Sequence, residues 1–137
     1  VLLRLAGQAA ALLGDGFDTE LCETHHRRKT DAPSGTALAL LEVLKGVGGK
    51  EAVFDRRGRG QRRENEIGVS VLRGGGVCGR HEVMFLGEAE TLTLCHTALD
   101  RSVFARGALT AAQWLCDGDK KGFFTMSDVL KGGERYD

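Results

Sequence analysis

Several common features are scarce or missing in this sequence, and their scarcity narrows what the chain can do. No apolar run approaches the roughly 20 residues that a membrane-spanning helix needs, and the first residues lack the polar flank and cleavage site of a signal peptide. The 19 basic residues are balanced by 19 acidic ones, so no overall field attracts nucleic acid or a membrane surface. We expect a soluble protein in which any anion site is local.

Cysteine is also sparse. The chain has four cysteines, with no CxxC pair and no dense framework: Cys22, Cys78, Cys95 and Cys116. Cysteines scattered in this way are typical of reduced thiols, which predicts a cytoplasmic protein.

The same scarcity argues against a metal site. A closed zinc site usually takes its ligands from tight paired motifs. The nearest candidates here are Cys22 with His25 or His26, and Cys95 with His96, but adjacent residues of a strand point to opposite faces. We therefore predict no metal site, and we interpret the histidines beyond residue 80 as strand residues with local hydrogen bonds.

A dinucleotide site is the next alternative, because "GGGVCG" at 74–79 formally matches GxGxxG. That fingerprint needs a strand before it and a helix after it, so that the pyrophosphate meets a helix N-terminus. A strand pattern follows instead, which favours a hairpin turn. No other segment offers a βαβ unit in the sequence, so we predict that this chain carries no nucleotide-binding half.

Hydrophobic periodicity predicts one α+β domain. Helical patterns cover 1–13, 34–45 and 100–116, the second with Ser34 as N-cap and the third capped by Asp100 and closing the core. Strand patterns cover 17–24, 66–74, 80–87 and 91–100, with a possible short strand at 52–55, a flexible arginine-rich loop at 56–63 and at most a short final turn at 125–130. We predict a mixed sheet of about four strands, the last three forming an antiparallel meander, with helices on one face.

The other face of this sheet carries apolar side chains at Leu72, Met84, Leu86 and Leu99, among threonines. This is more apolar surface than an exposed face usually presents, so we predict an oligomer interface there. Scattered surface leucines are the alternative, since single exposed apolar residues are ordinary.

Positive charge is concentrated in one place, "ETHHRRKTDAPSGTAL" at 23–38, which also holds the only proline. A helix that begins at Ser34 would offer the free amides of Gly35 and Thr36 and the positive end of its dipole to an anion. The adjacent histidines could move a proton near neutral pH. A solvated basic loop before an ordinary capped helix is the alternative.

This stretch resembles the signature of the dihydrodipicolinate reductases, enzymes of lysine and diaminopimelate synthesis. The positions at the signature's spacing are Glu20, Glu23, His25, Lys29, Asp31, Pro33, Ser34, Gly35, Thr36 and Ala37. The likeness continues through 66–108 to "FFTMSDVL" and covers essentially the whole chain. It departs from the family at "GQRRENEIG", where a Gly- or Pro-containing loop is expected, and at Cys78 and Cys95.

The resemblance implies that residues 1–137 are the C-terminal substrate-binding and tetramerisation domain of a cytoplasmic homotetramer. The N-terminal Rossmann domain of such an enzyme, which binds NADPH or NADH, is absent from this chain. The implied reaction is the reduction of 4-hydroxy-tetrahydrodipicolinate, a small dicarboxylate, to tetrahydrodipicolinate.

The resemblance also implies roles for individual residues. His25 would be the proton donor, with Lys29 beside it as the second catalytic residue. The substrate carboxylates would be held by His26, Arg27, Lys29, Gly35 and Thr36, and Arg101 would reach the cofactor side of the cleft.

A non-catalytic dicarboxylate-binding or oligomerisation module, left by truncation, is the alternative function. The first helical pattern begins without a capping residue or a methionine, which is typical of a cropped chain. Without a cofactor domain, we expect this chain alone to be inactive.

Overall fold

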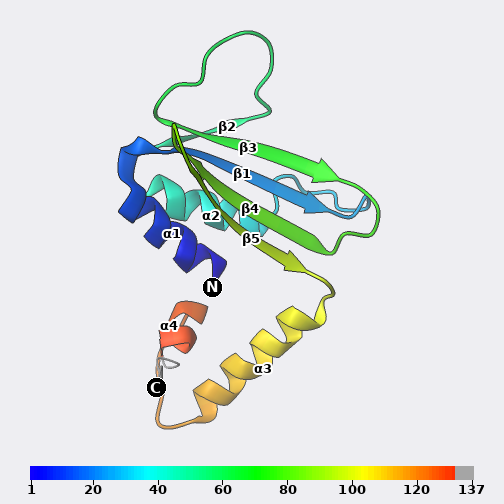
Figure 1. Ribbon diagram of the computed structural model, residues 1–137. Coiled ribbons are helices and arrows are strands. Elements are labelled where there is room, and N and C mark those ends of the chain that lie inside the picture. The colour runs from blue at the N-terminus through cyan, green and yellow to red at the C-terminus, as the bar shows by residue number, and fades with distance from the viewer. Residues whose placement is uncertain (132–137) are drawn as a thin grey trace. The chain divides into compact units, whose positions relative to one another are not determined.

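The computed structural model describes residues 1–131, which form two compact units, residues 2–99 and the part from Asp100 onward. Figure 1 shows their elements. The first unit contains α1 (Leu2–Leu13), the short 3₁₀ turn η1 (Gly14–Gly16), β1 (Asp18–His25), α2 (Gly35–Lys45), β2 (Glu51–Phe54), β3 (Glu66–Arg73), β4 (Gly79–Leu86) and β5 (Thr91–Ala98). No helix in the described part of the chain is long and apolar enough to cross a membrane.

The strands form one mixed sheet in the order β2-β3-β1-β4-β5. Strand β1 runs parallel to β3 and antiparallel to β4, while β2 is parallel to β3 and β5 antiparallel to β4. The predicted α+β class and mixed sheet are confirmed. The sheet has a fifth strand, because the short segment at 51–54 pairs along the edge of β3.

Two predictions about connectivity are wrong. The last three strands are not a meander, because β1 lies between β3 and β4, so only β4 and β5 form a hairpin. The segment 74–78 therefore crosses the end of β1 instead of closing a hairpin. A βαβ unit also exists: β1 and β2 run parallel and are joined through α2, with β3 inserted between them. Sequence spacing alone could not reveal a strand inserted from later in the chain.

Helices α1 and α2 cover one face of the sheet, and the core lies beneath them (Figure 1). Its buried apolar side chains alternate along the strands because successive strand residues point to opposite faces. The two helices approach closely where Gly7 faces Val43, since a Cβ at Gly7 would lie 2.7 Å from Val43 Cγ1. The core residues are Ala6, Leu21, Ala37, Leu40, Leu41, Leu44, Ile67, Val69, Val83 and Phe85.

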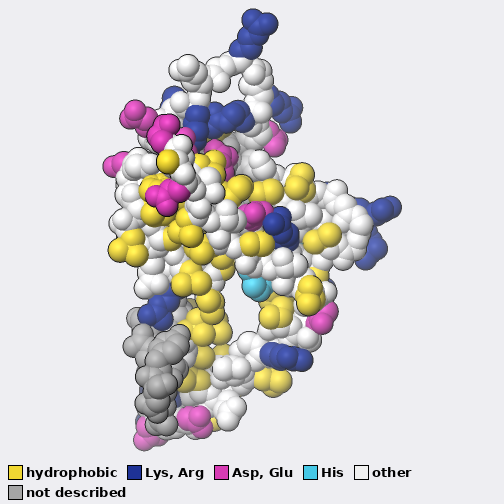
Figure 2. Space-filling view, in the orientation of Figure 1, with side chains coloured by type: hydrophobic (Ala, Val, Ile, Leu, Met, Phe, Trp, Pro, Cys, Tyr) yellow, Lys and Arg dark blue, Asp and Glu magenta, His cyan; other side chains and the backbone are white. Residues whose placement is uncertain are grey.

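The opposite face holds a mixture of charged, threonine and apolar side chains. The register places Leu72, Met84 and Leu86 on it, as predicted. The arginine-rich loop is attached to the sheet there, because Arg62 donates to Asp18 at 2.7 Å and to Glu20 at 3.3 Å. Figure 2 shows the resulting group of basic side chains beside acidic ones around this loop.

The second unit contains α3 (Ser102–Cys116) and α4 (Met126–Lys131). The N-cap of α3 is Arg101 and not Asp100 as predicted, although the Asp100 carboxylate accepts from the Ser102 amide at 2.6 Å. Trp114 packs edge-on against Phe124 with ring centroids 5.2 Å apart. The prediction that this helix closes the core stays a prediction, because α3 lies in the second unit and the core residues lie in the first.

Candidate site for an anion and a proton donor

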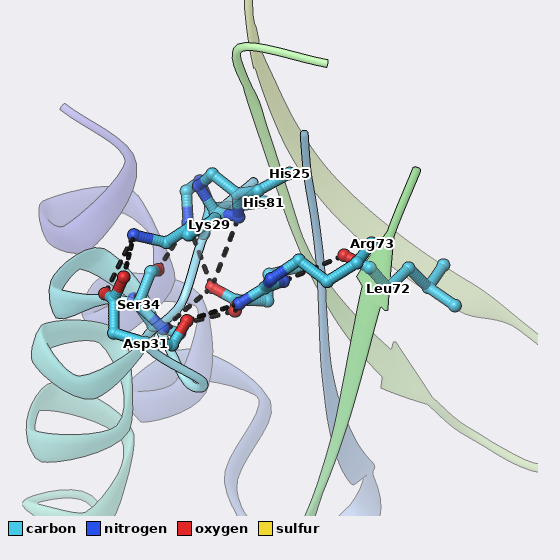
Figure 3. Close-up of polar contacts among 9 residues, drawn as sticks. His25, Lys29, Asp31, Ser34, Leu72, Arg73 and His81 are labelled. Carbon is cyan, nitrogen blue, oxygen red and sulfur yellow. Dashed lines mark hydrogen bonds and ion pairs between the residues drawn. The ribbon is translucent and has the colours of Figure 1, made fainter. Parts of the chain in front are cut away.

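A buried carboxylate lies at the centre of the basic stretch. Glu23 follows Thr19 and Leu21 on the inward side of β1, and its side chain is 0% exposed. An unpaired charge at such a position would be strongly destabilising, so it must be compensated by its neighbours. Figure 3 shows these neighbours converging from β1, β3, β4 and the start of α2.

Backbone and guanidinium groups compensate Glu23. Both carboxylate oxygens accept from the Ser34 amide at 3.1 Å, and Oε1 accepts from Arg73 Nη2 at 3.0 Å. Burial pulls the pKa of Glu23 upward, but the hydrogen bonds from Ser34 and Arg73 outweigh it and hold that pKa below its usual range. Glu23 is therefore an anion at neutral pH.

Two imidazoles face the same carboxylate. Glu23 Oε2 lies 3.7 Å from His25 Nδ1 and 3.5 Å from His81 Nε2. The rings meet edge-on with centroids 5.0 Å apart. Burial is the main cause that lowers the pKa of each histidine, and Glu23 opposes it in both cases. Both rings are thus biased toward the neutral form in the free chain.

Ser34 joins these imidazoles to the start of α2. Its hydroxyl oxygen accepts from the Ala37 amide at 3.2 Å, which confirms Ser34 as the N-cap, and it lies 3.0 Å from His81 Nε2. The next two backbone amides, those of Gly35 and Thr36, lie in the first turn of the helix, where amides have no carbonyl acceptor within the helix. A Cβ on Gly35 would meet nothing within 4 Å, so the space in front of this helix end is open.

Lys29 lies beside the same helix start, but its ammonium group already forms an ion pair. Its Nζ contacts both oxygens of the exposed Asp31 carboxylate at 2.8 Å. The hydrogen bond from Lys29 lowers the pKa of Asp31 below its usual range. An incoming carboxylate would therefore compete with Asp31 for Lys29.

The other predicted binding residues are located by their backbone positions, and the side chains of His26 and Arg27 form no hydrogen bond or ion pair with the buried carboxylate of β1 in the described part of the chain. His26 begins the turn after β1, with its carbonyl accepting from the Lys29 amide at 3.0 Å. Arg27 is exposed, and its amide donates to the Gly75 carbonyl at 3.3 Å. Arg101 belongs to the second unit, immediately before α3.

Sequence reasoning missed Arg73 and treated His81 as an ordinary strand residue. Arg73 lies beside His25 in the register, and it also donates to the Asp31 carbonyl at 2.7 Å. One signal was available, because Glu23 and His81 occupy positions where the apolar alternation of β1 and β4 points into the core. A polar residue at such a position requires a buried partner.

The ligand atoms of Glu23, His25 and His81 lie within 4.8 Å of one another, a spacing that can hold a metal ion. However, the Glu23 oxygens already accept hydrogen bonds from Ser34 and Arg73. The Arg73 guanidinium would also repel a cation. We interpret the group as a hydrogen-bonding network. Cys22 lies on the opposite face of β1 from His25, so the pairing considered from sequence spacing is not formed.

Together, the open helix start, Lys29 and the buried imidazole pair form a site whose chemistry suits a small anion beside groups that can exchange a proton. Comparison with known proteins gives the family. Residues 1–130 match the family described as "Dihydrodipicolinate reductase, C-terminus", and the chain belongs to that family.

Curated relatives agree with this assignment. The chain is 51% identical over 132 residues to the 4-hydroxy-tetrahydrodipicolinate reductase of Aquifex aeolicus, covering 95% of this chain and 49% of the relative. It is also 51% identical over 138 residues to the enzyme of that name from Methanopyrus kandleri, covering 98% and 50%. The chain thus spans about half the length of the curated relatives it matches.

A solved structure supports the fold. A dipicolinate-bound dihydrodipicolinate reductase from Paenisporosarcina sp. TG-14 matches with a TM-score of 0.61 at 24% identity, over 95% of this chain and 46% of that one. This similarity confirms the α+β architecture.

Proposed function

We propose that this chain is the substrate-binding half of a 4-hydroxy-tetrahydrodipicolinate reductase. The observation that carries the proposal is the convergence of Glu23, His25 and His81 on the open start of α2. The names of the curated relatives and the dipicolinate bound to the solved relative agree with a dicarboxylate ligand.

The substrate carboxylates would bind at the start of α2. The amides of Gly35 and Thr36 donate to one carboxylate, where the helix dipole also favours negative charge. Lys29 exchanges Asp31 for the ligand, and His26 and Arg27 supply further positive or polar surface. This arrangement brings the substrate to His25.

His25 then donates the proton that completes the reduction, and Lys29 stabilises negative charge beside it. A nicotinamide cofactor, NADH or NADPH, would supply the hydride. The residues described here do not fit a dinucleotide cradle, since the glycine-rich segment 74–78 leads into β4 and the loop before α2 lacks the GxGxxG fingerprint. We therefore assign cofactor binding mainly to a separate N-terminal half, with Arg101 reaching it from this chain. We expect no saturable enhancement of NADH fluorescence by the 137-residue chain, and observing one would contradict this assignment.

We also infer that the face bearing Leu72, Met84 and Leu86 joins copies of the chain in a cytoplasmic homotetramer. Sedimentation at increasing protein concentration tests this: a monomer at all concentrations would contradict it.

The decisive experiment joins this chain to the half of the Aquifex aeolicus relative that it does not match. The fusion should oxidise NADH or NADPH only when 4-hydroxy-tetrahydrodipicolinate is present. His25→Ala should lower turnover by about 10²- to 10⁴-fold, the usual range for loss of a general acid. Lys45→Ala, at the other end of α2 from Ser34, is the control and should retain activity. A fusion that binds dipicolinate without turnover would favour the alternative, a non-catalytic dicarboxylate-binding or oligomerisation module.

A further inference from the structure

Glu23 occupies an unusual position among the residues of the site. Its carboxylate is fully buried, and it accepts from the amide that begins the turn into α2 and from Arg73. The same carboxylate faces the buried Nδ1 of His25 at 3.7 Å. Within the described residues, that Nδ1 has no hydrogen-bond partner. An unpaired nitrogen on a ring that is 7% exposed requires an explanation.

We propose that Glu23 is a positioning residue, which holds His25 with Nδ1 toward the carboxylate and leaves Nε2 as the nitrogen that transfers the proton. This rests on the proposed role of His25 as the donor. A carboxylate near one imidazole nitrogen favours a proton on that nitrogen and so fixes the tautomer and the orientation of the ring. A shift of less than about 1 Å would bring Nδ1 within ordinary hydrogen-bond distance of Oε2.

The environment of Nε2 fits this assignment. Gly79 begins β4 beside the ring, and a Cβ there would lie 3.1 Å from His25 Nε2. Glycine therefore keeps the space next to this nitrogen free. His81 supports the ring from the side, with its own Nε2 engaged by Ser34 at 3.0 Å.

The proton balance follows from this geometry. In the protonated ring, Nδ1–H points toward Glu23 and Nε2–H points away from it. Transfer of the Nε2 proton to the substrate leaves a neutral ring with its remaining proton on Nδ1. Glu23 stays ionised throughout, since Ser34 and Arg73 hold its pKa low. Because the Ser34 amide binds the same carboxylate, Glu23 also keeps the start of α2 in place relative to the donor.

Long-range ¹H–¹⁵N NMR on the 137-residue chain tests the tautomer directly. Above the pKa of His25, the neutral ring should carry its proton on Nδ1. Glu23→Gln should replace that single tautomer by a mixture and lower the pKa of His25 further. Glu82→Gln is the matched control, because Glu82 lies on the opposite face of the same sheet and pairs with Arg80 at 2.7 Å.

A wild-type ring protonated on Nε2, or a Glu23→Gln variant with unchanged tautomer and pKa, would overturn the proposal. If Glu23→Gln does not fold, the wild-type tautomer still decides, since it needs no substitution. Dipicolinate titrated into the wild-type chain separates the two proposals: a chain that shows the Nδ1 tautomer but does not bind dipicolinate would retain the positioning role and refute the proposed function.

Discussion

The ion pair between Lys29 and Asp31 allows the proposed anion site to be tested quantitatively. In the free chain, Lys29 Nζ contacts both Asp31 oxygens at 2.8 Å, and the lysine side chain is only 20% exposed. A dicarboxylate that binds at the start of α2 must replace Asp31 as the partner of Lys29. Lys29 should therefore strengthen binding, and Asp31 should weaken it.

The size of the Lys29 effect follows from its chemistry. A charge-assisted hydrogen bond contributes roughly 1.5 to 3 kcal/mol. Because Lys29 must exchange the Asp31 carboxylate for that of the ligand, its net contribution to the binding free energy should lie near the lower limit of this range. Because about 1.4 kcal/mol corresponds to a factor of ten, Lys29→Ala should weaken dipicolinate binding about tenfold. Asp31→Asn should strengthen it.

Isothermal titration of dipicolinate into the 137-residue chain, at fixed ionic strength, measures both effects. In the Asp31→Asn background, Lys29→Ala should cost more affinity than in the wild type, since Lys29 no longer has a competing partner. Lys45→Ala, at the other end of α2 and 3.9 Å from Glu42, is the control and should change little. Equal affinity for Lys29→Ala and wild type would refute the anion site and leave the stretch as solvated surface.

Three other predictions concern the helix start, acid stability and proton linkage. Gly35→Ala should raise the unfolding free energy slightly, by about 0.5–1 kcal/mol, because no atom of the chain opposes the new Cβ. The same Cβ would occupy the space proposed for the ligand carboxylate, so the variant should bind dipicolinate at least tenfold more weakly. Unchanged affinity would contradict the proposal that the ligand occupies this space. Hydrogen bonds from Arg63 and Arg56 lower the pKa of Glu66 from 4.5 to about 2, so its contribution to stability is complete above pH 4.5 and is lost as the pH falls toward 2. In chemical denaturation, the unfolding free energy of Glu66→Gln should therefore depend less on pH in that window than that of the wild type. An equal pH dependence in both proteins would contradict this prediction. Dipicolinate binding near pH 6.5 should be accompanied by proton uptake, which calorimetry in buffers of different ionisation enthalpy detects. His25→Gln should remove most of that uptake. Equal uptake by the variant and the wild type would mean that the titrating group is not His25.

Local patterns in the sequence were sufficient to predict most elements. The apolar alternation of β1, β3, β4 and β5 and the Ser34 cap each depend on neighbours a few residues away, and the structure confirms them. The order of the strands was predicted wrongly as a meander, because the insertion of β1 between β3 and β4 depends on pairing between distant segments. Periodicity carries no information on which strands are neighbours.

The site shows the same division. The start of α2 was predictable because the cap and the helix that follows are contiguous in sequence. The network around Glu23 joins residues up to 58 positions apart, from Glu23 to His81, and Arg73 joins it from a third strand. The predicted roles of the site residues remain proposals: His25, His26, Arg27, Lys29, Gly35, Thr36 and Arg101.

A neutral imidazole in the free chain is compatible with a role as proton donor. Burial lowers the pKa of His25 most, Glu23 opposes that effect, and the positive charges of Lys29 and Arg73 lower the pKa further. A bound dicarboxylate would bring two negative charges toward these cations and offset their effect on the ring. The pKa of His25 must then rise, because opposite charge within a few ångströms favours the protonated form. A bound dicarboxylate would in this way favour protonation of His25, the proposed proton donor. The chain, which has no net charge, would then need a local excess of positive charge only where the dianion binds.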